Sequence, residues 1–148
     1  MDINELLELL QDKDDARAYA KTKEVVSASE ASDVYYAYTK DFATLLGSEK
    51  SYIRTRAFIL ICSQARWDDK GVIGEILPGM FLLLHDPKST VVRQCLNAIK
   101  EVVVFRPELS GEIEKELTRI DLTHYKDSMV PLIEKDIREV RQLIAEMK

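Results

Sequence analysis

Apolar side chains recur along most of the chain at steps of three and four residues, the spacing that places them on one face of an α-helix. The clearest runs are Ile3, Leu6, Leu7 and Leu10; Val92, Cys95, Leu96, Ile99 and Val103; and Ile133, Ile137, Val140, Ile144 and Met147. The sustained two-residue alternation of a half-buried strand is not found in the sequence. The pattern therefore predicts an all-α fold.

The apolar runs and the polar stretches between them divide the chain into eight predicted helices. They cover residues 2–11, 14–29, 32–46, 51–67, 72–84, 89–105, 109–121 and 129–147. Ser51, Ser89 and Ser128 stand where N-cap side chains would accept the first free N–H groups of a helix. The segment "AFILIC", residues 57–62, is apolar on every side, which predicts an internal helix.

The predicted helices repeat with a regular spacing. Those that start near residues 32, 72 and 109, and those near 14, 51, 89 and 129, follow one another at roughly 37–40 residues, in or near the range of HEAT and armadillo repeats. The units would be 2–29, 32–67, 72–105 and 109–147, within one domain of residues 1–148. Two registers align the second and third units, because either Ile53-Arg54 or Thr55-Arg56 can match Val92-Arg93.

The segment "EILPGMFLLLHDPKSTVVRQCLNAI" carries a resemblance to a known family. Its first helix has an internal proline, Pro78, its turn has Asp86, and its second helix opens with Val92-Arg93. In these respects it resembles a HEAT repeat of the HEAT/armadillo class. The whole chain, especially "YKDSMVPLIEKDI", is similar to small bacterial HEAT-repeat proteins of unknown function.

The resemblance implies a fold and a set of contacts. The expected fold is a right-handed α-solenoid of about four HEAT-like helix pairs, in which each pair covers the apolar face of the next. Asp86 and Arg93 would belong to a ladder of ion pairs that links the turns of neighbouring repeats. Such proteins act as interaction modules or scaffolds, so we expect a protein or peptide partner.

Charge and cysteine content narrow the function classes. The net charge of −5 is unevenly spread, with −6 over residues 1–49, +4 over 50–106 and −3 over 107–148. This distribution disfavours nucleic-acid binding, and a local basic patch for an acidic partner is expected instead. The acidic start and the interrupted apolar runs predict neither a signal peptide nor a membrane span. Two cysteines outside any CxxC motif favour a cytoplasmic location.

The residue types that build active sites are scattered. His85-Asp86 fits a helix end and a turn better than an acid–base pair, because adjacent residues seldom point at one ligand atom. Cys62 and Cys95 occupy apolar helix positions, where a free cysteine acts as a small core residue. We therefore predict no catalytic residue, no metal site, no cofactor and no enzymatic activity.

One enzyme class is kept as an alternative. Alkylpurine DNA glycosylases have HEAT-like folds and use Trp and Asp in a concave groove, and Trp67 is followed by Asp68 and Asp69. The chain is much shorter than those enzymes, is acidic, and has a single Trp. This reading ranks well below a binding function.

The favoured site is the concave face of the second helices, where an acidic peptide or protein surface would bind. The candidate partner-binding residues on that face are Tyr52, Arg54, Arg56, Arg66, Trp67, Arg93, Asn97 and Lys100. The protein is expected to be a monomer or a weak homodimer. The stripe from Ile133 to Met147 fits either a core-facing helix or a short coiled-coil seam.

Overall fold

The computed structural model describes residues 2–148, which form α-helices, short 3₁₀ turns and loops, with no strand among them. The α-helices are α1 (Ile3–Leu10), α2 (Asp15–Ser29), α3 (Thr39–Ala43), α4 (Ser51–Cys62), α5 (Val72–Phe81), α6 (Ser89–Ala98), α7 (Lys100–Phe105), α8 (Ser110–Thr118) and α9 (Val130–Glu146). Helices α6 and α7 are interrupted only at Ile99, whose N–H still donates to the Cys95 carbonyl over 2.9 Å. Counted as one, they confirm the all-α class and the prediction of eight helices.

Several predicted helices are shorter in the structure, most of all the two of the unit predicted over 32–67, while the one predicted over 109–121 ends at Thr118. The helix expected over 32–46 has its first helical turn at Tyr36 and is 3₁₀ over Tyr36–Tyr38 and Thr44–Gly47, around α3. The helix expected over 51–67 ends at Cys62, and a separate 3₁₀ turn covers Ala65–Trp67. Tertiary contacts explain the second break, because the Trp67 indole N–H donates to the Ser29 carbonyl on α2 over 2.7 Å.

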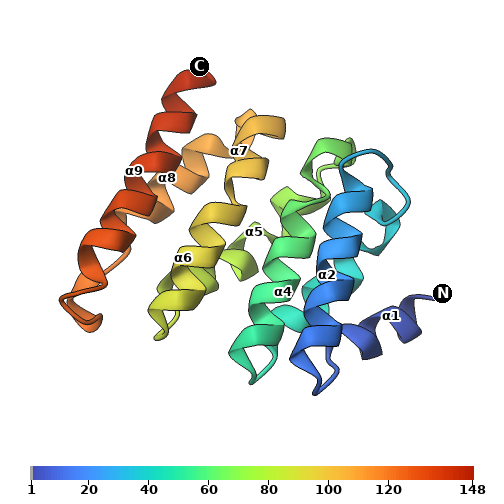
Figure 1. Cartoon of the computed structure of the whole chain (residues 1–148). Helices are drawn as coiled ribbons and strands as arrows, with labels where there is room; N and C mark the ends of the chain where they lie inside the picture. The colour runs from blue at the N-terminus through green and yellow to red at the C-terminus, as the bar shows by residue number, and fades with distance from the viewer. Residues whose placement is uncertain (1) are drawn as a thin grey trace.

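The helices lie in two layers (Figure 1). Helices α2, α4, α6 with α7, and α9 run side by side in that order and contact one another in sequence. Helices α1, α3, α5 and α8 lie on the other side, and α1 and α9 stand at opposite ends of the molecule. The predicted internal proline, Pro78, lies within α5.

The core runs between the layers and is densest around α4. Phe58, Leu60 and Ile61 have no exposed surface, as expected for an internal helix, whereas Ile59 is partly exposed on the outer side of its layer. Fully burying an aliphatic or aromatic side chain contributes about 1.5–3 kcal/mol to the free energy of unfolding. Helix α4 thus lies at the centre of the core, in contact with α2, α3, α5 and α6.

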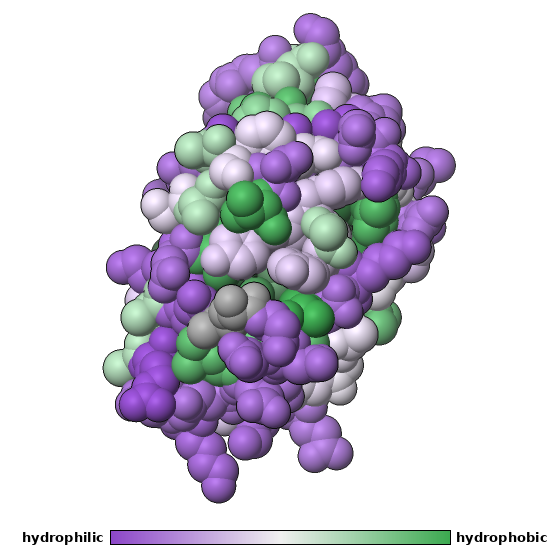
Figure 2. Space-filling view, turned by 90° about the vertical axis from the view of Figure 1, so that its right-hand side faces the viewer, coloured by the Kyte–Doolittle hydropathy of each residue, from purple (hydrophilic) through white to green (hydrophobic). Residues whose placement is uncertain are grey.

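The last helix uses its apolar stripe within the chain. Ile133, Ile137, Val140 and Ile144 are buried, and α9 contacts α6 and α7 along its length. Met147 is 40% exposed. The stripe is therefore a core-facing surface, and its four buried residues are not available for a coiled-coil seam. At the other end of the molecule, Figure 2 shows apolar side chains scattered among polar ones over the face formed by α1 and α2.

The turns before α4 and α6 have the same backbone geometry. Lys50 has φ −90° and ψ 119°, and Lys88 has φ −89° and ψ 118°. The two lysines are the N-cap residues. Ser51 and Ser89, which were predicted as N-caps, are therefore the first residues inside the helices. Ser128 is likewise not an N-cap, because Met129 occupies that position. In both turns the side chain two residues before the lysine accepts a hydrogen bond from the lysine N–H. The acceptor is Ser48 Oγ for Lys50 and Asp86 Oδ1 for Lys88.

Superposing these turns places Ser51 on Ser89, a spacing of 38 residues. Neither sequence register has this spacing, since one pairs Arg54 with Arg93 and the other pairs Arg56 with Arg93. Thr55 is the residue that corresponds to Arg93. A slip of one residue turns a side chain by about 100° around the helix axis, so the arginines that looked equivalent point to different neighbours.

Candidate functional site

A continuous groove runs along the outer surface of α4, between α2 on one side and α6 and α7 on the other. It consists of two hollows of about 640 Å³ and 320 Å³, and both are lined by Ile59 and Gln94. Ile59 forms the partly exposed apolar floor where the hollows meet. The larger hollow has the size of a ligand site.

The smaller hollow is bordered by two exposed aromatic rings and a buried arginine. Tyr19 is 59% exposed and Tyr52 is 38% exposed. The Arg56 guanidinium lies 5.0 Å from the Tyr52 ring centre and is itself 7% exposed. It donates to the Leu10 carbonyl and to Asp15, each over 3.0 Å. Arg56 therefore joins the α1–α2 corner to α4 and presents little charge to a partner.

The larger hollow brings together four of the predicted residues, Arg66, Arg93, Asn97 and Lys100. Two of its cations are already paired with α9, because Arg93 Nε lies 2.7 Å from Asp136 and Lys100 Nζ lies 2.8 Å from Glu139. The hydrogen bond from Lys100 lowers the pKa of Glu139. These pairs fix α9 against α6 and α7 and neutralise part of the expected basic patch.

Arg66 is held differently from the other cations of the groove. Its guanidinium donates to the Glu30 carbonyl at the end of α2 and stacks 4.6 Å from the centre of the Phe105 ring. Asn97 is exposed and makes no side-chain hydrogen bond within residues 2–148. Asn97 is thus the predicted residue whose polar group is most available in the groove.

Arg54 and Trp67 line neither hollow. The Trp67 indole is engaged with Ser29. Asp68 is 2% exposed, and its carboxylate accepts from the Tyr36 hydroxyl and from the N–H groups of Val72 and Ile73 at the start of α5. Both groups of the Trp–Asp pair that suggested a glycosylase are therefore occupied in helix packing, and Asp69 alone is exposed.

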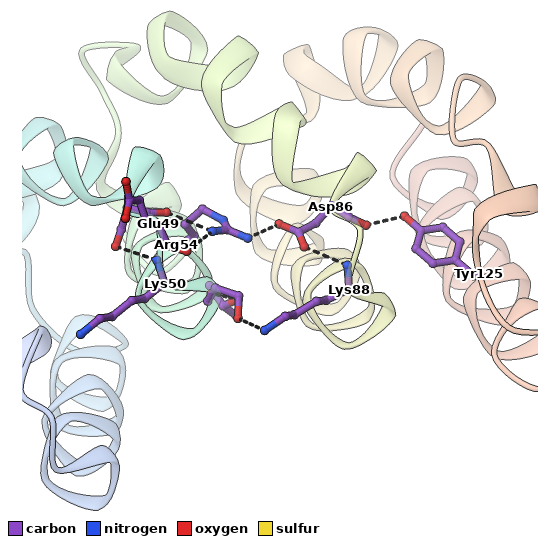
Figure 3. A network of polar contacts seen from close by, with 9 residues as sticks. Glu49, Lys50, Arg54, Asp86, Lys88 and Tyr125 are labelled. Carbon is purple, nitrogen blue, oxygen red and sulfur yellow. Dashed lines mark hydrogen bonds and ion pairs between the residues drawn. The ribbon is translucent and has the colours of Figure 1, made fainter.

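Arg54 belongs to a hydrogen-bond network that links three successive corners, as we call the turns between helices (Figure 3). They are the turn before α4, the turn before α6 and the loop before α9. The Arg54 guanidinium donates to the Ser48 and Glu49 carbonyls of its own corner, over 3.0 and 3.1 Å, and to Asp86 Oδ2 of the next corner over 2.6 Å. The Tyr125 hydroxyl of the loop before α9 donates to the Asp86 carbonyl over 2.7 Å. Asp86, which is 6% exposed, is the centre of this network.

Asp86 and Arg93 both form ion pairs, but not in the ladder between turns that the family resemblance implied. Asp86 does link neighbouring corners, but its partner is Arg54, and Arg93 reaches Asp136 on α9 rather than an acidic turn residue. The spacing of 38 residues gives the physical reason, because it turns Arg93 away from the direction that Arg54 takes. Asp86 is the one carboxylate of this network, and its neighbouring corners contribute the Ser48 and Glu49 carbonyls, bound by Arg54, and the Tyr125 hydroxyl.

The cysteines and His85 are built into the packing. Burial raises the pKa of both Cys62 and Cys95 thiols, so the reactive thiolate is disfavoured at neutral pH. His85 Nε2 lies 2.6 Å from Glu116 on α8, and this contact joins the end of the α5 segment to α8. No group of three or more His, Cys, Asp or Glu side chains among residues 2–148 is arranged to hold a metal ion.

Several groove residues were not among the predicted ones. Tyr19, Val26 and Glu30 face the groove from α2, and Gln94 and Glu101 face it from the opposite wall. Their steps of four and seven residues follow one helix face, and that spacing was the signal for them. It could not be used without knowing that α2 and α6 flank α4.

Comparison of the chain with protein-family models, with curated proteins and with solved structures gives no match. No family is therefore identified for the chain by these comparisons. Within residues 2–148, no helix has the length and apolar content needed to cross a membrane.

Proposed function

We propose that the protein is a non-catalytic interaction module built from four HEAT-type helix pairs. Two observations support the repeat architecture. The corners before α4 and α6 share their backbone angles at a spacing of 38 residues, and the bond from Arg54 to Asp86 links one corner to the next. In this architecture the second helices are α2, α4, α6 with α7, and α9, the layer that carries the groove.

The observation that carries the proposed binding function is the continuous groove itself. Its floor is apolar at Ile59, its rim carries Tyr19 and Tyr52, and Asn97 and Gln94 offer amide groups on one wall. Apolar centres with aromatic and amide-bearing edges are typical of surfaces that bind protein segments. We infer that an extended or helical peptide segment of a partner lies along α4.

The ion pairs of Arg93 and Lys100 with α9 limit how well an acidic partner segment could bind. An acidic segment, as expected from the basic middle of the sequence, would have to displace Asp136 and Glu139 before it could use Arg93 and Lys100. Part of the binding free energy would be lost in breaking those pairs. The apolar floor and the free amide groups therefore support binding more directly than the basic residues do.

A groove-blocking substitution tests the proposed function. Random twelve-residue peptides displayed on phage are selected on the wild-type protein, and the affinity of the enriched peptides is measured by fluorescence anisotropy. Asn97→Trp fills the larger hollow from an exposed helical position. Ser27→Trp, at an exposed position of α2 that lines neither hollow, is the matched control.

The proposed function predicts that Asn97→Trp weakens binding by about tenfold or more, which corresponds to about 1.4 kcal/mol. The control should bind within about twofold of wild type. Equal binding by both variants would show that the groove is not the site. Failure to enrich any peptide at affinities up to about millimolar would contradict the binding function.

A further inference from the structure

We propose that the larger hollow binds a lysine or arginine side chain of the partner segment, with the alkyl stem on Val26, Ile59 and Ala98 and the cationic end at Glu30 and Glu101. This inference rests on the proposed binding function and specifies the partner: a segment that carries a basic residue beside apolar ones. It reverses the charge that the sequence pattern suggested for the ligand.

The first support is that two acidic side chains at the hollow are exposed and unpaired within residues 2–148. Glu30 and Glu101 both line it, both are exposed, and neither carboxylate is in an ion pair within residues 2–148. Glu30 is the C-cap residue directly after α2 and Glu101 lies in the first turn of α7, so the two stand on opposite walls of the groove. A cationic ligand group could approach them without breaking an existing ion pair.

The second support is that the cations of the same hollow are occupied. Arg93 and Lys100 are paired with Asp136 and Glu139, and Arg66 donates to a main-chain carbonyl and stacks on Phe105. With their carboxylate partners, the two pairs contribute no net charge. The remaining charges around the hollow are the positive charge of Arg66 and the negative charges of Glu30 and Glu101. Their sum is one negative charge.

The direction of the helices adds to this negative potential. Helix α2 ends at Ser29 and α4 ends at Cys62, and both residues line the larger hollow. The C-terminal end of a helix carries partial negative charge and favours a nearby cation by roughly 0.3–1 kcal/mol. At the end of α2 this effect is partly met already, because Arg66 and Trp67 donate to the Glu30 and Ser29 carbonyls, so the two free carboxylates supply most of the attraction for a cation.

The shape and lining of the hollow fit the rest of a long basic side chain. Val26, Ile59 and Ala98 are partly exposed and give the hollow an apolar wall. Lysine and arginine place their alkyl stems on apolar surface while the charged end stays at a polar rim. A volume of about 640 Å³ accommodates such a side chain together with a neighbouring apolar residue of the segment.

The test compares peptides and variants that differ only in charge. From the peptides selected on the wild-type protein, one enriched sequence is synthesised with Lys, Gln or Glu at its most constrained basic position. Each is titrated against wild type, against the Glu30→Gln/Glu101→Gln variant and against a Glu108→Gln/Glu134→Gln control. Glu108 and Glu134 are also exposed and in no ion pair, but they lie outside the groove. The control matches the change in net charge, so it separates a local effect from general attraction to an acidic protein.

We expect the selected peptides to be rich in Lys or Arg next to apolar residues. The Lys peptide should bind wild type and control alike, and should bind the Glu30→Gln/Glu101→Gln variant about fivefold to tenfold more weakly, with a smaller loss at high salt. The Gln peptide should not distinguish the three proteins. Enrichment of acidic peptides, or equal binding of the Lys peptide to all three proteins, would overturn this inference.

The outcomes separate this inference from the proposed function. If acidic or uncharged peptides are selected and Asn97→Trp still blocks them, the groove is a binding site and only the assignment of a basic ligand fails. If no peptide is selected, both fail together.

Discussion

Removing the Asp86 carboxylate should destabilise the protein more than any other single change at its corners. Asp86→Ala breaks the 2.6 Å ion pair with Arg54 and the 3.0 Å hydrogen bond from the Lys88 N–H. The Asp86 side chain is 5% exposed and that of Arg54 is 20% exposed, so water replaces little of what is lost.

The expected loss in the free energy of unfolding is about 3 kcal/mol. Breaking one side of a buried ion pair costs roughly 3–5 kcal/mol. The lower end applies because the Arg54 guanidinium keeps its bonds to the Ser48 and Glu49 carbonyls. For a chain of this length, about 3 kcal/mol corresponds to a fall in Tm of roughly 6–12 °C. Asp86→Asn should cost less, about 1–2 kcal/mol, because its amide oxygen can still accept from Lys88.

Urea unfolding followed by circular dichroism at 222 nm measures these changes, and calorimetry gives Tm. The matched control is Glu75→Ala, which breaks an ion pair with Lys40 in which both side chains are more than 60% exposed; it should cost less than about 1 kcal/mol. A double-mutant cycle with Arg54→Ala isolates the pair, and a coupling of about 1–3 kcal/mol is expected. A cost below about 1 kcal/mol for Asp86→Ala, or additive single variants, would refute the role given to this network.

Three further predictions concern polar groups that are buried or partly buried. Arg56→Met should lower the free energy of unfolding by about 2–3 kcal/mol in urea titrations, because the Leu10 carbonyl loses its donor; a cost below about 0.5 kcal/mol would contradict this. Burial, followed by the bond to a carboxylate, raises the pKa of Tyr36 to about 12, so its stabilisation is complete below the unfolded value of about 10 and disappears as the pH rises to about 12. Absorbance at 295 nm should show this late ionisation in wild type and not in Tyr36→Phe. The thiols of Cys62 and Cys95, whose pKa values are raised by burial, should react with Ellman's reagent only on unfolding, and rapid reaction of the native protein would show that the site is open.

The corner network also shows how far local sequence could predict contacts. The turn at Asp86 was predicted because an acid before a proline is a strong turn signal, whereas its role as a link between corners was implied by the family resemblance. Its partner could not be identified in the same way, since Arg54, Arg56 and Arg93 all stand near the start of an apolar helix. The structure gives these three arginines three different acceptors: Asp86, the Leu10 carbonyl with Asp15, and Asp136.

The groove was predicted less completely than the helices. Of the eight predicted residues, Arg66, Arg93, Asn97 and Lys100 line the larger hollow, Tyr52 and Arg56 line the smaller one, and Arg54 and Trp67 line neither. The net charge of the segment from residue 50 to 106 did not reveal the electrostatics of the groove, because the neutralising carboxylates Asp136 and Glu139 lie about forty residues further along the chain. Ion pairing across that distance depends on how α9 packs, and no local pattern records it.

The sequence by itself determined the helices of this protein. Helical periodicity is a local property, since each apolar position needs only neighbours three and four residues away to define a buried face. The central position of α4 followed for the same reason, because a helix that is apolar all round needs neighbours to cover it, and within residues 57–62 Ile59 alone stays partly exposed. Tertiary structure decided the rest: which arginine meets which acceptor, and which charges stay free in the groove. Those outcomes depend on rotations of about 100° per residue around each helix and on contacts between distant helices, so a spacing of 38 rather than 39 residues was enough to redirect Arg93.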